Sequence, residues 1–449
     1  MDYRKLIDKL LIKGNQRMKD LEAYMVINKA IEIGIFGGEV DKYSISESGG
    51  LSLRGVSDGK MGYSYTEKLD ETSIDMLIDE AYENGKYIDE TDGDEIFSGS
   101  MYYKELKKYN EKLSITPMAD KIDFAMNIEK EAFAIDPRVI AVQHCGYEEF
   151  EQERFIVNTK GVNLYDRLNG AVGYISVVVK EVEDTKTGMG FRVFSDLSDV
   201  DCKEIAKDAV DEAISMLGAS PIKTGSYPMI IKNTIFADLL QAFESIFSAD
   251  NAQKGLSLLK DKIGETIAST IFTLVDDPFY KEGYATSAFD DEGTSTSYKK
   301  VIDKGVLNTL LHTWKTAKKE NIESTGNGSR ASYKSTLRIS PTNFYVEKGI
   351  SSFDELFEGI EKGVYIINLA GLHSGLNPVS GDFSLSAHGY EILDGRINRP
   401  INQITIAGNI YEILKDIVAI GDDLKFGFPG NGHFGSPSIK IKAISVAGE

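Results

Sequence analysis

The segment Gly218-Ala-Ser-Pro-Ile-Lys-Thr-Gly225 divides the 449-residue sequence into two parts with different patterns. Glycine and proline within a short polar stretch favour a linker, because neither residue continues a helix or a strand well. We therefore predict a mixed α/β N-terminal domain over residues 1–218 and a β-rich C-terminal domain over residues 226–449. The predicted fold class is α+β, with mainly antiparallel strands after the linker.

Helices and strands alternate before the linker. Amphipathic spacing predicts helices over residues 73–87, from about residue 119, and over residues 201–217. Thr72 and Asp75 resemble a capping box at the start of the first helix, and Phe133 is assigned to the buried face of the second. In Tyr174–Lys180, β-branched residues at alternate positions predict a strand with one buried face.

Short strands predominate after the linker. A strand is expected over Met229–Ile231, followed by a single helix over residues 234 to about 247 with a continuous apolar stripe. Alternating residues predict two further strands, Gln403–Ala407 and Ile439–Ala443. Frequent glycine, serine, threonine and asparagine between these elements favour tight turns, as in an antiparallel architecture.

Composition excludes several classes of function. The chain has 50 basic and 70 acidic residues and a formal net charge of -20, and no dense basic run offers a face for phosphates. We therefore expect neither a nucleic-acid partner nor a membrane partner. The N-terminal residues lack the apolar core of a signal peptide, and the two cysteines form no paired motif. A cytoplasmic protein with reduced thiols is expected.

Two glycine-containing motifs match enzyme signatures without the flanking structure that those signatures need. Gly430-Asn-Gly432-His-Phe-Gly435 fits the dinucleotide fingerprint, but a turn entering a strand follows it where a helix would be required. Gly55-Val-Ser57-Asp-Gly59 fits the nucleophile elbow, but a strand-like stretch follows the serine. The first motif is interpreted as a glycine-rich loop, and Ser57-Asp58-Gly59 as a hairpin turn.

Histidines and adjacent acids give weak signals for a catalytic centre. No two of the five histidines lie within one or two helical turns, so positions in loops or on the surface are expected for His144, His312, His373, His388 and His433. The acidic runs Asp276-Asp277, Asp290-Asp291-Glu292 and Asp422-Asp423 are expected in solvated turns. The alternative is an enzyme that uses paired carboxylates, with Asp290 or Asp422, provided that two acids converge in one pocket.

Short motifs follow one another in a fixed order through the second part: Leu274-Val-Asp-Asp-Pro278, Phe289-Asp-Asp-Glu-Gly293, Gly305-Val-Leu307, Ser324-Thr-Gly-Asn327 with Arg330, Ser340-Pro-Thr-Asn343, Val379-Ser-Gly-Asp-Phe-Ser384, Ile406-Ala-Gly-Asn409 and Gly435-Ser-Pro-Ser438. This series resembles the TldD/PmbA family, also called the modulator of DNA gyrase family. The likeness extends more loosely through Gly50-Leu-Ser-Leu-Arg-Gly55 in the first part. The order and spacing carry the resemblance, since each motif alone is short.

The resemblance implies a branch of that family. The TldD-like branch carries His-Glu-x-x-x-His on a helix and a cysteine ligand near the C-terminus. Aligned with that motif, Gln241 and Ile246 occupy the imidazole positions and Ala242 occupies that of the catalytic glutamate. No cysteine follows Cys202, although the family's thiolate would lie near residues 421–423. Zinc proteolysis needs three protein ligands and a general base, so the resemblance points to the TldE/PmbA branch, with no metal and no catalytic residue in this chain.

Membership of that branch implies a partnership. Such chains pair with a TldD-like protease subunit, which carries the zinc, around a chamber that admits unfolded peptide. The expected chain is inactive without that partner and capable of homodimerising alone. A peptide-binding homodimer with no enzymatic partner is the other alternative.

Extended peptide can be held by strand addition, for which the β-rich second part could supply an edge. The candidate peptide-binding residues are acids, amides and an arginine within the resembling motifs, and turn stabilisation is the competing interpretation for each. They are Asp291, Glu292, Asn327, Arg330, Asp382 and Asn409.

Overall fold

The computed structural model describes residues 2–88 and 95–449 and divides the chain into two compact units. Unit 1 runs to Leu217 and also includes Phe289–Ser295 and Gly328–Arg338, two segments from the later part of the sequence. Unit 2 comprises Gly218–Ala288, Thr296–Asn327 and Ile339–Glu449. Mixed helices and strands in unit 1 and a strand-rich unit 2 confirm the α+β class.

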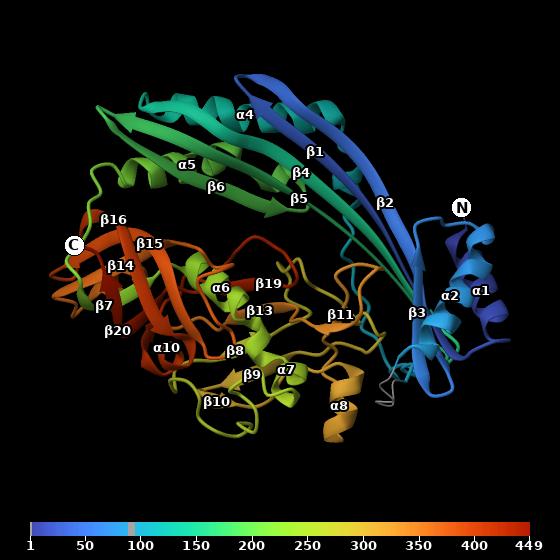
Figure 1. The fold of residues 1–449 in the computed structure, drawn as a ribbon. Helices are drawn as coiled ribbons and strands as arrows, with labels where there is room; N and C mark the ends of the chain where they lie inside the picture. The colour runs from blue at the N-terminus through green and yellow to red at the C-terminus, as the bar shows by residue number, and fades with distance from the viewer. Residues whose placement is uncertain (1, 89–94) are drawn as a thin grey trace. The chain divides into compact units, whose positions relative to one another are not determined.

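Unit 1 is built on a six-stranded antiparallel sheet of order β3-β2-β1-β4-β5-β6. Its strands are β1 Lys19–Phe36, β2 Glu39–Ser57, β3 Lys60–Thr66, β4 Val139–Asn158, β5 Asn163–Glu181 and β6 Asp184–Phe194. Four of these strands are long enough for one end of the sheet to be covered by different helices from the other end (Figure 1). The predicted strand Tyr174–Lys180 is confirmed as part of β5.

Helices cover two parts of one face of this sheet. Helices α4 (Met118–Ile135) and α5 (Cys202–Ser215) pack on one end, where Ile33 and Ile35 are buried. Helices α1 (Tyr3–Gly14) and α2 (Ile74–Lys86) pack on the other end, around Leu21 and Met25. Because side chains alternate along a strand, Glu22 and Tyr24 lie on the opposite face. The short helix α3 (Glu111–Ile115) precedes α4.

Unit 2 contains two larger sheets around one apolar core. The first has the order β10-β9-β8-β13-β19-β18, formed by β8 Leu274–Asp276, β9 Lys299–Asp303, β10 Val306–Leu307, β13 Asn343–Val346, β18 Lys425–Phe426 and β19 His433–Ser436. The second has the order β16-β15-β14-β7-β20-β17, formed by β7 Gly225–Ile231, β14 Lys362–Ala370, β15 Asp382–Leu393, β16 Arg396–Asn409, β17 Ile417–Ile420 and β20 Ile439–Ala447. Pairing of β16 with β20 closes the second sheet on itself.

Most strand pairs of unit 2 are antiparallel, with parallel pairing between β7 and β14 and between β13 and β19. The small pair β11 (Gly328–Ser329) and β12 (Arg338–Ile339) begins in unit 1. The helices of unit 2 are α6 Asn233–Ala242, α7 Ala249–Gln253, α8 Trp314–Glu320, α9 Phe353–Phe357 and α10 Ile410–Asp416. The strands predicted at Met229, Gln403 and Ile439 are confirmed within β7, β16 and β20.

Three details of the helix predictions are wrong. The helix expected over residues 234–247 ends at Ala242, and a 3-10 turn, Glu244–Phe247, follows it. The capping box at Thr72 is absent, because Asp70 accepts the hydrogen bond from the Thr72 backbone N–H and α2 begins after a 3-10 turn. Phe133 is 45% exposed, since it lies on the far edge of the apolar stripe of α4.

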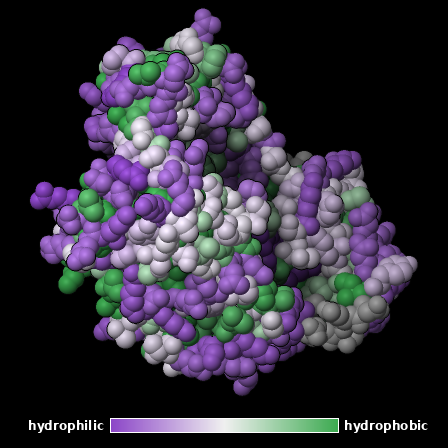
Figure 2. Space-filling model, turned by 60° about the vertical axis from the view of Figure 1, so that its left-hand side comes forward, coloured by the Kyte–Doolittle hydropathy of each residue, from purple (hydrophilic) through white to green (hydrophobic). Residues whose placement is uncertain are grey.

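The two rejected enzyme motifs have the structures expected of turns and loops. Asp58 and Gly59 both have positive φ angles, of 52° and 77°, and connect β2 to β3 as a hairpin. Gly430 and Gly432 form a bridge ahead of β19, with no helix after them. Within residues 2–88 and 95–449, no helix is long and apolar enough to cross a membrane. Hydrophilic residues predominate on the face shown in Figure 2.

Candidate functional site

The end of α6 in unit 2 carries the three residues aligned with a zinc motif. Gln241 and Ala242 are half-buried on the last turn of α6, and Phe243 ends the helix with non-helical backbone angles. Ile246 lies in the 3-10 turn that follows, and its side chain is 1% exposed within the apolar core of unit 2. The helix therefore does not present Gln241 and Ile246 as a pair on one face.

A glycine-containing segment before β19 lies close to α6. A side chain at Gly430 would meet the Gln241 amide nitrogen, 3.2 Å from its Cβ, and one at Gly427 would meet the Asp238 carboxylate, at 3.3 Å. Burial raises the pKa of Asp238 to about 6. The buried ring of His433 accepts a hydrogen bond at Nδ1 from the Tyr284 N–H and donates from Nε2 to the Gly427 carbonyl, 3.1 Å away.

The side chains beside α6 do not fit a zinc ion. Zinc in proteases is held by three nitrogen, sulfur or oxygen ligands with an open position for water. Ile246 has no lone pair and points into the core, and both ring nitrogens of His433 are engaged by backbone groups. Among the residues that the structure describes, no three histidine, cysteine, aspartate or glutamate side chains gather into a group that could hold a metal.

The segment aligned with the family's cysteine ligand forms a tight polar turn. Asp423 accepts hydrogen bonds from the Ser438 N–H and hydroxyl, at 2.8 and 2.7 Å, and from the Asn233 amide, at 3.1 Å. Asn233 is the first residue of α6, so this turn connects the start of the helix to the residues that precede β18 and β20. Asp422 is exposed, whereas Asp423 is half-buried and engaged by these donors.

The acidic run Asp290-Asp291-Glu292 in unit 1 is buried, contrary to the expectation of a solvated turn. The three residues are 5%, 7% and 3% exposed. Asp290 accepts hydrogen bonds from the backbone N–H groups of Glu292, Thr294 and Gly328, at 2.8 to 2.9 Å. Carboxylate oxygens of Asp290 and Glu292 both lie 3.0 Å from the position that a Cβ on Gly328 would take. Burial, and next the charge of Glu292, raise the pKa of Asp290 to about 8.

These acids belong to a buried charge network on the sheet face opposite α1 and α2. Glu22 accepts two hydrogen bonds from Arg54, at 2.7 and 2.9 Å, and one from Arg330, at 2.7 Å. Asp291 accepts hydrogen bonds from the Arg154 guanidinium, at 2.5 Å, and from the Arg330 N–H, at 2.7 Å. The network comprises Glu22, Tyr24, Arg54, Arg154, Asp290, Asp291, Glu292 and Arg330, and it ties the two late segments of unit 1 to β1, β2 and β4.

The network does not form an open carboxylate site. Asp290 and Glu292 converge, as the alternative enzyme hypothesis required, but both are nearly inaccessible and Asp290 is saturated by backbone donors. Acid and base catalysis needs a carboxyl group within hydrogen-bonding reach of a substrate. The arrangement fits a structural role, in which partner charges compensate for the loss of hydration.

The remaining predicted site residues serve internal contacts in unit 2. Asn327 is buried and donates to the Asp276 carboxylate, 2.8 Å away, and to the Ser340 carbonyl. Asn409 donates to the Asp382 carboxylate, at 2.8 Å, and its side-chain oxygen accepts from the Tyr411 N–H as the N-cap of α10. Asp382 is exposed. Contact of these residues with peptide stays a prediction.

The buried histidines differ from the sequence expectation. His312 and His433 are each 2% exposed, whereas His144 and His373 are exposed and His388 is half-buried. Burial lowers the pKa of His433 to about 4 and also lowers the pKa of His312. Both rings are therefore neutral at pH 7, and His433 is a structural residue in the strand next to α6.

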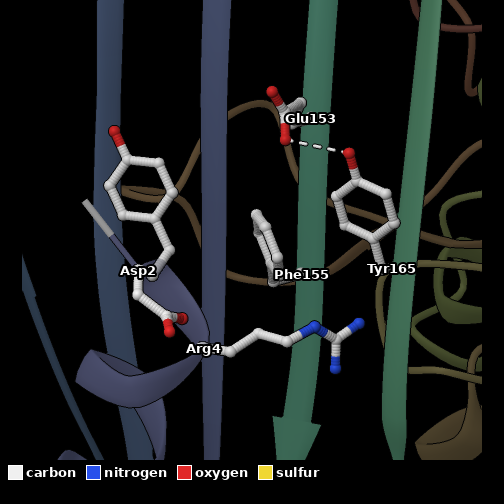
Figure 3. A pocket seen from close by; sticks show the side chains of 6 residues that line it. Asp2, Arg4, Glu153, Phe155 and Tyr165 are labelled. Carbon is white, nitrogen blue, oxygen red and sulfur yellow. Dashed lines mark hydrogen bonds between the residues drawn. The ribbon is translucent and has the colours of Figure 1, made fainter.

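An open hollow of about 640 Å³ lies beside the start of α1 in unit 1 (Figure 3). Its lining residues are Asp2, Tyr3, Arg4, Glu153, Phe155 and Tyr165. The Tyr165 hydroxyl donates to Glu153 at 2.9 Å, and the Arg4 guanidinium donates to Asn163 and lies 5.8 Å from the Phe155 ring centroid. These polar groups satisfy one another, and none of the predicted site residues lies in this hollow.

Sequence reasoning missed Glu22, Arg54 and Arg154 as members of the network. Each lies in a strand, and Glu22 stands between Leu21 and Ala23. A charged residue between apolar neighbours in a strand is a signal of a buried partner or a polar face. The sequence could have raised the question, but it could not have named the partners, which lie more than 130 positions away for Arg154 with Asp291.

Comparison with known proteins places the chain in a family. Models of the first, central and C-terminal domains of the PmbA/TldA metallopeptidases match residues 21–85, 111–217 and 224–448. A Thermotoga maritima protein whose solved structure is named for modulation of DNA gyrase is 30% identical, with 99% of this chain and 100% of that chain covered at a TM-score of 0.91. This chain belongs to the PmbA/TldD family.

Members named for both branches are similar to this chain. TldE from Thermococcus kodakarensis shares the fold, with a TM-score of 0.91 at 23% identity over 99% of this chain and 100% of the other. A metalloprotease TldD homolog from Buchnera aphidicola is 27% identical over 431 residues, covering 89% of this chain and 86% of its own length. Overall similarity therefore shows the family but does not distinguish its two branches. The side chains at the end of α6 are the feature that differs between the branches.

Proposed function

We propose that this PmbA/TldD-family chain is the non-catalytic, metal-free, TldE/PmbA-like subunit of a cytoplasmic zinc metalloprotease that acts on unfolded or extended peptides. The observation that carries the proposal is Ile246, a hydrocarbon side chain buried in the core at the position aligned with a zinc-binding imidazole. Gln241 and Ala242 supply neither a second imidazole nor a general base. The zinc would be held by a TldD-type partner subunit.

The role of such a subunit is to complete the peptide-binding chamber. A chain that holds peptide in an extended conformation lowers the entropic cost of presenting it to the partner's zinc. Hydrogen bonds to the peptide backbone would make that binding tolerant of sequence.

The experiment compares the chain alone, a TldD-type subunit alone, and the two mixed. Zinc content by elemental mass spectrometry should be well below one ion per molecule for this chain. Cleavage of a labelled unfolded polypeptide should appear only when the TldD-type subunit is present, should rise on mixing, and should stop with a chelator. Stoichiometric zinc, or chelator-sensitive cleavage by this chain alone, would overturn the proposal.

Partner identity is tested by purification from the host and native mass determination. A complex of this chain with a TldD-type subunit supports the proposal. A complex of two copies that persists when the TldD-type chain is added would favour the peptide-binding homodimer. Chelator-insensitive turnover by the isolated chain would favour an enzyme of another class.

A further inference from the structure

Strand β2 of unit 1 leaves part of its outer edge without a neighbouring strand. β2 pairs with β1 over almost its whole length, but β3 pairs with it only from Leu51 to Ser57. In the described part of the chain, no strand pairs with the outer side of residues 39–48 (Figure 1). An unpaired edge presents backbone N–H and C=O groups that can accept another strand.

One face of this edge is apolar from Val40 to Ile45. Val40, Tyr43 and Ile45 are 42%, 50% and 62% exposed. They lie in register with Ile35, Ile33 and Ile31 of β1, of which Ile33 and Ile35 are buried beneath α4. The apolar surface covered by the helices thus continues outward to the edge, where an added strand would bury it.

The other side of the same edge strand is polar. Lys42, Ser44, Ser46 and Ser48 alternate with the apolar row, and Lys42 forms an ion pair with Glu32. An added strand would therefore need apolar side chains on one face only, as in a half-buried antiparallel ladder. The irregularity between Gly34 and Ile35 places the bulge of β2 at Asp41, so the regular stretch begins at Lys42.

The charges along this edge favour a basic occupant. Glu39, Asp41 and Glu47 are exposed and form no ion pair with any residue that the structure describes. In an antiparallel pair of two copies centred near Tyr43 or Ser44, Glu39 and Asp41 of one strand would lie near Glu47 of the other. Like charges directly opposite each other destabilise a strand pair. Self-pairing in these registers is therefore disfavoured, and lysine or arginine near both ends of the added strand is favoured.

We infer that residues 39–48 of β2 are a docking site for an extended basic peptide, which adds to the sheet as a strand with its apolar side chains over Tyr43 and Ile45. The inference rests on the proposed function in that the peptide would be an unfolded substrate. It assigns peptide holding to unit 1, whereas the sequence suggested an edge in the β-rich part. The class of peptide follows from the edge: alternate residues are apolar, and cationic residues lie near the ends.

The test uses the full chain without any partner subunit. The probe is a labelled Lys-Val-Lys-Val-Thr-Val-Lys-Val-Lys peptide, and amide hydrogen exchange locates where it binds. Binding should slow exchange within residues 39–48 and should weaken as salt is raised. Two matched probes separate the contributions: one has glutamate in place of lysine, and the other carries methyl groups on alternate backbone nitrogens. Each should bind at least about tenfold more weakly.

Variants of the chain test the apolar row. Y43T combined with I45T should lower affinity about tenfold, because both side chains lose apolar area while the strand keeps residues that favour β structure. I350T, at an isoleucine 97% exposed in unit 2, is the matched control and should leave affinity unchanged. Thermal unfolding of each variant checks that the fold is retained.

Three outcomes would overturn the inference: unchanged exchange in residues 39–48, protection confined to other segments, or protection that depends on protein concentration without peptide, which would indicate a second copy. Failure here is distinguishable from failure of the proposed function. Peptide binding is measured without zinc or partner, and cleavage is measured with both.

Discussion

The charge network of unit 1 and the end of α6 in unit 2 differ in how far the sequence indicates their role. The acids at 290–292 look like a solvated turn, yet they are buried in a network with arginines from β2, β4 and the residue after β11. The end of α6 aligns with a catalytic motif, yet it presents an amide, a methyl group and a hydrocarbon side chain packed into the core. Ionisable residues are concentrated in the network that holds unit 1 together, whereas none of the three positions aligned with the zinc motif is ionisable.

The difference teaches that buried charge is no sign of catalysis by itself. In the network, Glu22 accepts hydrogen bonds from two guanidinium groups and Asp290 accepts three from backbone N–H groups. The hydrogen-bonding capacity of both carboxyl groups is therefore used within the protein. Perturbed ionisation is common at catalytic sites, but structural ion-pair networks produce it as well. Access to a substrate separates the two cases.

The largest effect should come from breaking the network. E22A leaves Arg54 and Arg330 buried without their shared carboxylate, and we expect a loss of about 3–5 kcal/mol in the free energy of unfolding. Denaturant unfolding measures the loss. As a control, D211A removes an exposed i,i+4 ion pair with Lys207 and should cause no measurable change in stability. Equal effects of the two substitutions would show that the network contributes no more than surface charges.

The next effect should come from converting the α6 side chains into the zinc motif. Q241H, A242E and I246H together should destabilise the chain by about 3 kcal/mol, because position 246 lies in the core. Zinc should remain substoichiometric by elemental mass spectrometry. Q241H alone, at a half-buried position, is the control and should cost less than about 1 kcal/mol. Tight binding of one zinc by the triple variant would contradict the geometry at α6.

The dependence of stability on pH tests the acid pair within the network. The raised pKa of Asp290 means that the folded chain keeps a proton up to about pH 8, which the unfolded chain loses near its ordinary pKa of 3.8. Stability contributed by this group is therefore present at low pH and is lost as pH rises through that window. E292Q removes the neighbouring charge and should flatten the fall, which for one proton is at most about 1.4 kcal/mol per pH unit.

Unfolding by urea at several values between pH 5 and pH 8 gives the slopes for this comparison. E183Q, at an exposed glutamate in the turn between β5 and β6, should keep the wild-type slope. Identical slopes for E292Q and wild type would mean that Glu292 does not govern the ionisation of Asp290.

The smallest effect should come from Asn409 in unit 2. N409A removes the N-cap of α10 and the hydrogen bond to Asp382, and about 1 kcal/mol of stability should be lost. N409D keeps a capping oxygen and should recover part of that loss. The affinity for an unfolded peptide is measured on both variants. If N409D restores stability but not an affinity that N409A has lost, Asn409 also contacts peptide. Full recovery of both stability and affinity would confine Asn409 to capping.

Local patterns determined much of the fold. Apolar spacing located α2, α4, α5 and the start of α6, because each helix buries one stripe on a sheet or core. The Asp58-Gly59 turn was predictable, since both residues tolerate the positive φ that a tight hairpin needs. The break at Phe243 was not predictable, because the apolar stripe continues through Ile246 and Phe247 into the same core.

The chemistry absent from α6 was determined by the sequence alone, because an isoleucine and an alanine cannot supply a ligand or a base in any conformation. Only the tertiary structure decided that the acids at 290–292 are buried and that part of the β2 edge is exposed. The burial depends on arginines far away in the chain, which compensate for the charges. The exposed edge depends on how far along β2 the pairing with β3 extends, and that pairing begins only at Leu51. Burial and pairing are properties of contacts between segments, and spacing within one segment does not record them.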